Sequence, residues 1–430
     1  MQNYSIVIMI MAIMLLLSAL ADKIRIPSPI LLITAGIGIG FIPQLPHIEL
    51  DPEVIFLIFL PPLLHDAAFN ISFKDFRTNI NTIGTLAISL VFITALSVAV
   101  TAHYLIPGMT WPLSFVLGAI LSATDAVAAI SITKGLGLSH KTVTILEGES
   151  LVNDASALVI YRFAVAAVTG SVFIWWKASL QFIILMAGGL LVGVLLERIL
   201  AFILQRVQRN STVAISFMLL MPFIAYRLAE ELHVSGVIAV VILGLGIARY
   251  SRKVFPDSIK MQSKAFWDTI IFLLNGLIFI LIGLQFPYVV TTISKNQILT
   301  YLGYAFVVTI VVLVVRIFRV FLQRAGLLRE YIKGKRRVSK DALLDFNTSL
   351  VVSWAGMRGI VSLATAIGLP ATLNNGEPFP QRTPIIFISI AVVLFTLIGQ
   401  GLPLPWLVRT IRKVHPAPVA SKEPDDKLAE

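Results

Sequence analysis

The sequence predicts an all-α membrane protein with many spans, and three observations lead to that fold class. Hydrophobic residues make up 57% of the 430-residue chain, charged residues only 13%, and the mean hydropathy is +0.90. The apolar residues gather in runs that are long enough, as helices, to cross about 30 Å of hydrocarbon. Polar residues interrupt two of these runs near their middle, which indicates helices that break inside the membrane.

We expect about thirteen transmembrane helices, because about thirteen apolar runs follow one another along the chain. They run roughly over 4–21, 28–42, 54–68, 80–103, 112–133, 142–168, 177–204, 211–229, 234–249, 265–286, 296–322, 346–373 and 384–408. The second and ninth runs are short for a full crossing, so we expect them to tilt or to be partly re-entrant. The first run has neither a basic leading segment nor a small-residue cleavage site, which favours a retained span over a signal peptide.

The net charge of +11 follows the connections between the spans. Lys and Arg gather in alternate connections and in the C-terminal tail, with a cluster at 333–340, whereas the other connections hold few of them. By the positive-inside rule, this asymmetry predicts an outside N-terminus, a cytoplasmic C-terminus and a location in the cell membrane. The positive charge therefore gives no reason to expect nucleic acid as a partner, although attraction to anionic lipid is compatible with it.

The sequence lacks the signatures of nucleotide and thiolate-metal sites. It has no Walker-type phosphate loop and no cysteine. The glycine runs at 36–40 and 244–246 lie at the ends of short spans, where small residues let helices approach closely. We therefore expect no nucleotide, no cofactor and no enzymatic activity. The tail at 414–430 is too short to fold alone, and we expect it to be disordered.

Asp125 lies about ten residues into the fifth span, within Ser122-Ala123-Thr124-Asp125-Ala126-Val127. A carboxylate near the midplane, beside Ser and Thr oxygens, fits a broken helix whose freed carbonyl groups join it as ligands of a hard cation. The alternative is that Asp125 only caps a half-helix, and the two roles are compatible.

The sixth span carries two polar stripes. Ser150 and Asp154 are one turn apart on one face, and Glu149 and Asn153 are one turn apart on the adjacent face. A carboxylate inside a bilayer is costly and is by default a candidate functional residue. We expect Asp154 to bind the ion and Glu149 to form a structural ion pair, while the reverse roles stay open. Glu147 lies one turn before Ser150, nearer the cytoplasmic end, where we expect it to be solvated.

The twelfth span is the second broken span, because two glycines flank an arginine in Gly356-Met357-Arg358-Gly359. A guanidinium inside the membrane must be neutralised. We expect Arg358 to pair with Glu149, which would hold the fifth, sixth and twelfth spans in register and leave Asp154 free to titrate.

Two further charged residues lie near span ends. Asp66 follows the double proline Pro61-Pro62 in the third span, close to the cytoplasmic end, where a helix-end role and a role in lining the ion path are both compatible with the sequence. Arg162 lies eight residues beyond Asp154, about 12 Å along the helix, and is expected at the outer rim.

The two broken spans are seven spans apart, which is the offset expected if spans one to six and eight to thirteen are inverted repeats joined by the seventh. An odd offset gives the two halves opposite topology. No strong internal identity accompanies this arrangement, so the prediction of inverted repeats depends on the two breaks and on the span count.

Four motifs in order resemble those of the cation:proton antiporter family that includes the bacterial NhaP antiporters and the animal sodium/proton exchangers. They are Leu60-Pro61-Pro62 to Asp66, Ala123-Thr124-Asp125, Gly148 to Asp154, and Gly356-Met357-Arg358-Gly359. The resemblance covers most of the chain, from about Leu60 to Pro370. Many bacterial members have Glu at the position of Asp66, and the Asp66 side chain is the shorter of the two.

The resemblance implies a homodimer with a moving ion-binding core. The implied core comprises 79–172 and 295–413, the implied dimer and gate domain comprises 1–78 and 173–294, and 414–430 is a cytoplasmic tail. Asp154 is implied to be the exchanging carboxylate, with further ligands from Asp125, Ser150, Asn153, the Thr124 backbone and, on the opposing wall, Asp66. Glu149 and Arg358 are the implied structural pair.

One carboxylate that serves two ligands accounts for the implied exchange. A protonated Asp154 holds a cation poorly and a cation-bound Asp154 holds a proton poorly, so the two compete. If only the neutralised site can cross the membrane barrier, cation and proton exchange without ATP. Sodium is the expected cation, with lithium or potassium as alternatives. By resemblance to members with Asn before the Asp, as Asn153 stands here, exchange is expected to be one for one and electroneutral.

Two other classes of protein are less consistent with the sequence. An intramembrane aspartyl protease would cast Asp125 and Asp154 as a catalytic pair, but the Gly-x-Gly-Asp signature is absent and Arg358 would have no role. A cation channel or sensor fits the polar spans but not the pairing of two broken helices. A flux measurement separates these alternatives, because a channel passes cations without moving protons.

Overall fold

The computed structural model describes residues 2–24, 27–42, 52–71, 73–133, 136–170, 175–207, 210–334, 343–373 and 375–414. Most of the predicted tail at 414–430 and of the basic cluster at 333–340 lies outside these residues. The described helices are α1 (Gln2–Ile24), α2 (Ser28–Gly40), α3 (Pro52–Asn70), α4 (Phe73–Thr78), α5 (Ile80–Gly84), the π-helical η1 (Thr85–Leu90), α6 (Val91–Leu105), α7 (Trp111–Ser122), α8 (Ala126–Thr133), α9 (His140–Val168), α10 (Trp175–Val207), α11 (Ser211–Glu231), α12 (Gly236–Val254), α13 (Asp257–Thr291), α14 (Lys295–Ile332), α15 (Phe346–Trp354), α16 (Ile360–Ile367), α17 (Arg382–Gly401) and α18 (Leu404–Val414).

The architecture is all-helical and multi-pass, as the sequence predicts. Within the described residues, the chain forms no β-strand and only one isolated bridge, between Thr372 and Pro378. Each predicted span coincides with one helix or with consecutive helices. Eight helical segments of the described chain are long and apolar enough to cross a membrane, and shorter apolar helices lie in α1, α2 and α3. The count of thirteen crossings and the inverted repeats stay predictions.

Among the helices that are longer than their predicted spans, α13 and α14 extend furthest. α13 begins at Asp257, before the apolar run starts at 265, and α14 continues past 322 to Ile332. The added turns are rich in Lys, Gln, Arg, Leu and Glu, which favour helix in water as well as in lipid. The apolar run therefore marks the part of a helix that lipid can surround, while the helix itself extends further.

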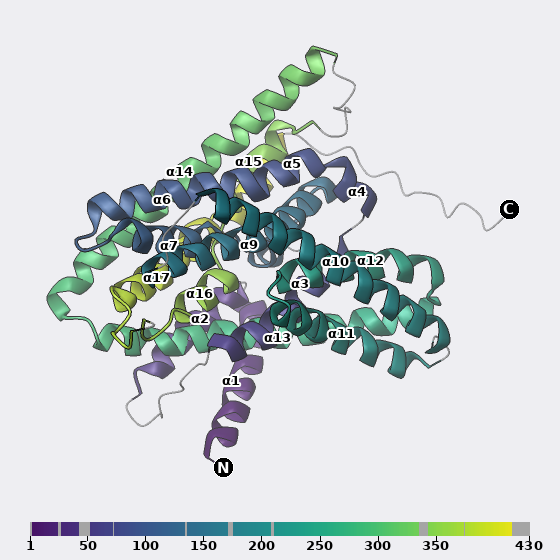
Figure 1. Cartoon of the computed structure of the whole chain (residues 1–430), viewed down its shortest axis with the longest axis horizontal. Coiled ribbons are helices and arrows are strands. Elements are labelled where there is room, and N and C mark those ends of the chain that lie inside the picture. Colours follow the sequence, from purple (N-terminus) through teal and green to yellow (C-terminus); the bar gives the residue numbers. More distant parts are fainter. Residues whose placement is uncertain are drawn as a thin grey trace.

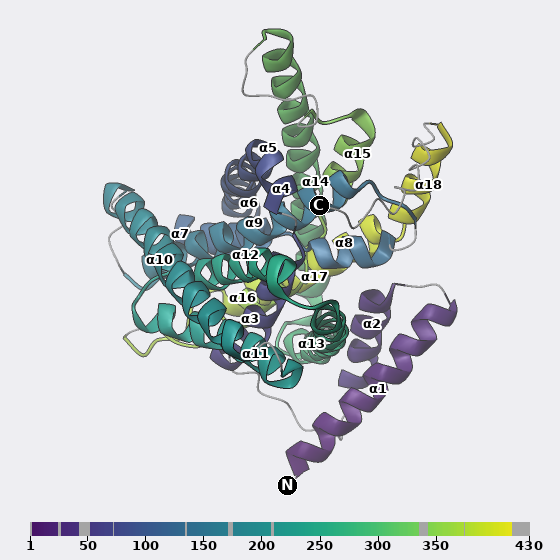
Figure 2. The same cartoon turned by 90° about the vertical axis from the view of Figure 1, so that its right-hand side faces the viewer.

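The helices pack around two apolar cores, and α9 lies between them. One core joins α6, α7, α14 and α17, and the other joins α3, α10, α11 and α12. α9 gives Leu146 and Tyr161 to the first core and Leu151 and Ala155 to the second. Figure 1 shows the first group on the left and α10 to α12 on the right, with α3 and α9 between them. Figure 2 shows α1 and α2 beside α13 at one side of the molecule. The polar stripes of α9 therefore lie at the seam between two packed bodies.

The glycine run at 36–40 serves helix packing. A methyl group added to Gly36 would collide with the carbonyl group of Ile280 and the backbone of Gly283, and one added to Gly283 would collide with the carbonyl group of Ile33. α2 and α13 thus touch backbone to backbone, as small residues permit. Gly38, on another side of α2, has open space around it.

Candidate ion-binding site

The first helix break divides the fifth predicted span. α7 ends at Ser122, α8 begins at Ala126, and Ala123 between them is extended with φ −64° and ψ 141°. The backbone of this stretch binds groups from other helices. The Asp125 N–H donates to the Met357 carbonyl at 2.8 Å, and the Ser150 hydroxyl donates to the Thr124 carbonyl at 2.8 Å. The predicted break is confirmed, and it exposes carbonyl oxygens inside the helix bundle.

The second break divides the twelfth predicted span and crosses the first. α15 ends at Trp354 and α16 begins at Ile360, so the residues between them are not helical. The Met357 carbonyl that accepts from Asp125 lies in this stretch. The N–H of Arg358 donates to the Thr396 hydroxyl of α17 at 3.1 Å. Two unwound segments are therefore hydrogen-bonded to each other at their crossing.

At this crossing, one positive and one negative side chain each lie at helix ends whose dipole has the opposite sign. The Arg358 guanidinium donates to the carbonyl group of Leu121, at 2.8 Å, and to that of Gly356, which lie at the C-terminal ends of α7 and α15. The Asp125 Oδ1 accepts from the Ala128 N–H of α8 at 3.0 Å. Its Oδ2 lies against Gly359, just before α16. A cation at helix C-termini and an anion at helix N-termini are each stabilised by the aligned peptide dipoles. The broken helices themselves thus stabilise Arg358 and Asp125, although the Asp125 Oδ2 has no hydrogen-bond partner among the described residues.

The sequence predicts that Glu149 pairs with Arg358, and this prediction of the partner is wrong. Glu149 does form a buried ion pair, but with Arg316 of α14, whose Nη1 and Nη2 reach its two oxygens at 2.6 and 2.7 Å. The Glu149 and Arg316 side chains are 1% and 2% exposed. Arg316 also donates from Nε to the Val352 carbonyl, and it fills the space beside Gly356, where any side chain would collide with it.

Sequence reasoning missed Arg316 although a signal was available. Arg316 stands inside the eleventh predicted span, 296–322, and a charge within a span is itself a marker of a functional or structural site. Arg358 is the predicted partner of Glu149 because two glycines flank it. Those glycines mark the helix break, and the guanidinium donates to the Gly356 carbonyl of that break and to the Leu121 carbonyl of α7, which leaves Glu149 for Arg316.

The remaining polar groups of α9 converge on Thr124. The Asn153 Nδ2 donates to the Thr124 Oγ1 at 3.0 Å, and the Thr124 hydroxyl lies 3.4 Å from the Glu149 Oε1. The Ser150 hydroxyl also accepts weakly from the Ala126 N–H, at 3.4 Å. Glu149, Asn153 and Ser150 therefore hold the unwound stretch against α9.

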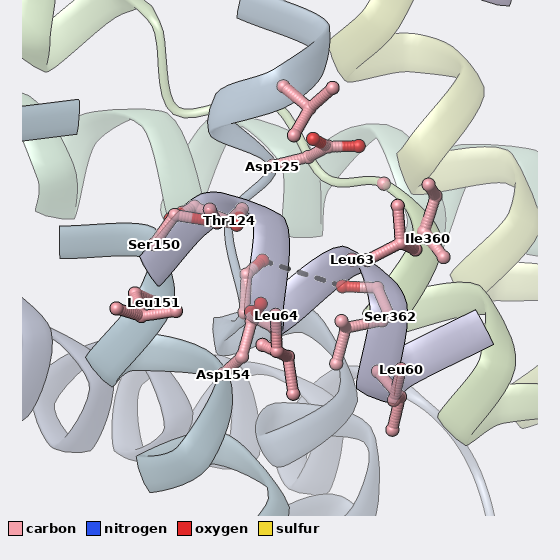
Figure 3. A pocket seen from close by; sticks show the side chains of 15 residues that line it. Leu60, Leu63, Leu64, Thr124, Asp125, Ser150, Leu151, Asp154, Ile360 and Ser362 are labelled. Atoms are coloured by element: carbon pink, nitrogen blue, oxygen red, sulfur yellow. Dashed lines mark hydrogen bonds between the residues drawn. The ribbon is translucent and has the colours of Figure 1, made fainter. Parts of the chain in front are cut away.

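Asp154 is 7% exposed, and its Oδ1 is buried without a hydrogen-bond partner in the described part of the chain, as is the Oδ2 of Asp125. Asp154 lines a cavity between α3, the first break, α9 and α16, which Figure 3 shows from close by. The cavity is lined by Leu60, Leu63, Leu64, Ala67, Ala123, Thr124, Asp125, Val127, Ser150, Leu151, Asp154, Gly359, Ile360, Val361 and Ser362. An unpartnered carboxylate oxygen thus faces a cavity that also contains hydroxyl and carbonyl oxygens.

The predicted site residues are brought together to different degrees. Asp154, Asp125, Ser150 and Thr124 line the cavity, whereas Asn153 lies behind Thr124. Asp66 does not line it; its Oδ1 accepts from the Asn70 Nδ2 at 3.0 Å within α3. No group of three or more His, Cys, Asp or Glu side chains positioned to hold a metal ion occurs within the described ranges. The groups at the cavity, two carboxylates that each have an unpartnered oxygen beside hydroxyl and carbonyl groups, are oxygen donors of the kind that hard cations bind.

A sequence profile decides the family. The profile described as "Sodium/hydrogen exchanger, transmembrane" matches residues 8–410. The chain belongs to the sodium/hydrogen exchanger family. Within that family, it is 36% identical over 394 residues to a "Sodium, potassium, lithium and rubidium/H(+) antiporter" of Bacillus pumilus, covering 89% of this chain and 58% of that protein's length. It is also 30% identical over 420 residues to the "Na(+)/H(+) antiporter NhaH" of Halobacillus aidingensis, covering 94% of this chain and 97% of that protein.

A solved exchanger has the same fold. The sodium proton antiporter MjNhaP1 of Methanocaldococcus jannaschii superposes with a TM-score of 0.70 at 21% identity, covering 95% of this chain and 98% of that one. A second structure of MjNhaP1, from electron microscopy, gives a TM-score of 0.73 over 97% and 99% of the two chains. The exchanger fold of this chain is therefore established independently of the motif comparison.

Proposed function

We propose that this chain exchanges a monovalent cation, most readily Na⁺, for H⁺ across the cell membrane, with Asp154 as the carboxylate for which cation and proton compete. The observation that carries the proposal is the unpartnered Asp154 oxygen in a cavity beside two crossing broken helices. Near it, Glu149 is paired with Arg316, and the Arg358 guanidinium donates to two carbonyl groups. Asp125 also keeps an unpartnered Oδ2, but its Oδ1 caps α8, so the proposal takes Asp154 as the carboxylate that exchanges a proton for a cation.

The cation ligands in this proposal are Asp154, the Ser150 hydroxyl and the Thr124 carbonyl group. Asp125 contributes through its charge, because its Oδ1 is engaged in capping α8. Asn153 positions Thr124, and Asp66 acts from outside the cavity wall rather than as a direct ligand. No cofactor and no ATP are needed, because the two ions drive each other.

Movement in the proposal is alternating access between two bodies. The core would comprise residues 79–172 and 295–413, and the dimer and gate domain 1–78 and 173–294, with the protein assembled as a homodimer and its C-terminus in the cytoplasm. The apolar core of α3, α10, α11 and α12 supports this division because, apart from Leu151 and Ala155 of α9, it lies within the proposed dimer and gate domain; the other core also includes residues of α1, α2 and α13. Each broken helix stays within the first body, which carries the site as a unit.

The test is cation-induced recovery of a pH-sensitive dye in vesicles that contain the protein, repeated with Na⁺, Li⁺ and K⁺. Asp154→Asn should abolish the response to every cation, because the amide can neither bind a proton nor balance a cation charge. The matched control is Asp257→Asn, whose side chain is 98% exposed and should leave exchange unchanged. Normal exchange by Asp154→Asn would refute the assignment. A K⁺-selective antiporter is the second candidate, and the same assay distinguishes it; cation flux without proton movement would indicate a channel.

A further inference from the structure

Two hydroxyl groups from different helices hold consecutive carbonyl groups of the first break. The Ser150 hydroxyl of α9 donates to the Thr124 carbonyl at 2.8 Å, and the Ser362 hydroxyl of α16 donates to the Ala123 carbonyl at 3.4 Å. All four residues line the cavity that contains Asp154. Figure 3 shows Ser150 and Ser362 on opposite sides of Asp154, and its dashed line is the hydrogen bond that Ser362 donates.

The oxygens near Asp154 are not equally free to bind a cation. The Asp125 Oδ1 accepts from α8, whereas the Asp125 Oδ2 and the Asn153 Oδ1 have no hydrogen-bond partner among the described residues. A hydroxyl that donates its hydrogen keeps its lone pairs, and a carbonyl that accepts one hydrogen has a second lone pair. Ser362 and the Ala123 carbonyl are therefore available in the same way as Ser150 and the Thr124 carbonyl.

We propose that the Ser362 hydroxyl and the Ala123 carbonyl complete the cation site opposite Ser150 and the Thr124 carbonyl, so that Ser362 sets the affinity and selectivity for the cation. This inference rests on the proposed function. Hard cations take about six or more oxygen ligands, more than Asp154, Ser150 and Thr124 supply. A ligand on α16 also places the second broken helix in direct contact with the cation.

The physical consequence concerns cation size. The Ser362 bond to Ala123 is long, at 3.4 Å, so the hydroxyl can turn toward a cation with little loss. A side chain on α16 approaches from the wall opposite α9, and its reach therefore limits how large the oxygen cage can be. Removing it should weaken binding and change the preference among Na⁺, Li⁺ and K⁺.

The experiment measures the KM for each cation in the vesicle assay with Ser362→Ala, Ser362→Thr and the control Ser389→Ala. Ser389 is a fully buried serine of α17 that does not line the cavity. Ser362→Ala should raise the KM for the preferred cation by about three- to tenfold, the loss expected for one neutral polar contact. The maximal rate and the thermal stability should stay close to those of the unchanged protein. Ser362→Thr, which keeps the hydroxyl, should retain most of the affinity, and Ser389→Ala should change nothing.

The ligand role of Ser362 would be wrong if Ser362→Ala left the KM for every cation within twofold of that of the unchanged protein. If Asp154→Asn were inactive in that same series, the proposed antiport would stand and only the role of Ser362 would fail. If Asp154→Asn exchanged normally, the proposed function itself would fail, whatever the result at Ser362.

An independent observation concerns the far end of the α9 seam. Arg162, two turns past Asp154, donates from Nη2 to both oxygens of Glu230 on α11, at 2.8 and 2.7 Å. Glu230 also accepts from the Gly236 N–H at the start of α12, at 3.2 Å. Other side chains of α9 bond within its own body, as Glu149 does with Arg316 and Tyr161 with the Gly368 carbonyl. The Arg162 bond instead crosses to the other body.

An apolar cluster beside this pair shares residues with the cavity wall. Ala123, Ala157 and Val91 form a buried cluster, against which Ile160 and Val361 pack. Ala123 and Val361 also line the cavity. Arg162 follows Ile160 by two residues on α9, and the side chains of Arg162 and Glu230 are 44% and 25% exposed.

We infer that the Arg162–Glu230 pair, which joins α9 to α11, is a latch that favours the conformation seen here, and that it must open during each transport cycle. This inference also rests on the proposed alternating access. A partly exposed ion pair is weak, so it biases the equilibrium between conformations without preventing motion.

The test uses the absence of native cysteine, because a single introduced thiol then reports alone. Ile160→Cys is labelled with a water-soluble thiol reagent, alone and combined with Glu230→Gln or with the control Glu231→Gln. Glu231 pairs within α11 with Arg227 and is 57% exposed. Glu230→Gln should increase the labelling rate by about two- to fivefold, the population change equivalent to one partly exposed ion pair. Equal labelling rates in the two combined variants would rule out the latch. If Asp154→Asn had still lost exchange in the vesicle assay, the proposed function would stand and only the latch would fail.

Discussion

At the scale of single residues, the interior holds several charges in different surroundings. Glu149 is paired with a guanidinium, the Arg358 guanidinium donates to two carbonyl groups, and the Asp125 Oδ1 caps a helix. Asp154 and Asp125 each keep one buried oxygen without a partner among the described residues. Because an uncompensated buried charge is costly, we expect a proton or a cation to accompany these carboxylates, as the proposed exchange at Asp154 requires.

The Arg316 pair should be structurally essential. Arg316→Gln leaves Glu149 buried and unpaired, which typically costs about 3 to 5 kcal/mol. The control Arg227→Gln removes an arginine that is 65% exposed and bonded to Glu231, and should cost under about 1 kcal/mol. Thermal unfolding of the purified protein in detergent measures both. Similar melting temperatures for the two variants would contradict the assignment of Arg316 as the buried partner.

Gly359 should tolerate no side chain. A methyl group there would lie on the Asp125 carboxylate, so Gly359→Ala must displace either Asp125 or the start of α16. We expect cation-dependent dye recovery to be lost. Gly399→Ala, on α17, meets nothing within 4 Å and should keep the full response. Unimpaired exchange by Gly359→Ala would mean that the Asp125 position is not required.

At the scale of helices, the sequence predicts where elements break better than where they end. The polar stretch at 122–125 and the glycines around Arg358 locate both breaks, because backbone freed in a membrane needs polar partners. The ends of α13 and α14 are not predictable from apolarity, since their outer turns are polar yet helical. Helix packing is specified by small residues, whose partners only the fold reveals.

The contact between α2 and α13 provides a test of that packing. Gly36→Ala inserts a methyl group against the backbone of α13 and should destabilise the protein by about 1 to 3 kcal/mol. Gly38→Ala makes the same change two residues away, in open space, and should be neutral or stabilising by up to about 1 kcal/mol. Thermal unfolding of the two variants side by side decides the matter, and equal stabilities would argue against close contact at Gly36.

At the scale of the whole molecule, the two packed bodies meet along α9, and the site moves with one of them in the proposed cycle. If Asp154 is the one carboxylate that changes its ligand, one cation replaces one proton and no net charge crosses. Each charge moved through 100 mV would contribute about 2.3 kcal/mol, a factor of about fifty in equilibrium.

Electroneutrality can be measured directly. We expect Na⁺-driven proton movement in proteoliposomes to have the same rate and end point when the membrane potential is clamped at zero or at about 100 mV by a potassium gradient with valinomycin. This measurement is restricted to conditions in which K⁺ itself is not exchanged. A rate or end point that follows the clamped potential would show that a net charge crosses in each cycle.

The sequence by itself determined the membrane class, the two broken helices and the presence of acidic residues within the spans, because hydropathy and the cost of intramembrane charge are local properties. It also required that Glu149 and Arg358 be neutralised. Only the tertiary structure decided which groups do this. Glu149 pairs with Arg316 of α14, far along the chain, and Arg358 donates to carbonyl groups at the ends of the broken helices. Neutralisation depends on distances of about 3 Å between atoms of different helices, and a sequence carries no information on which of several buried arginines comes that close.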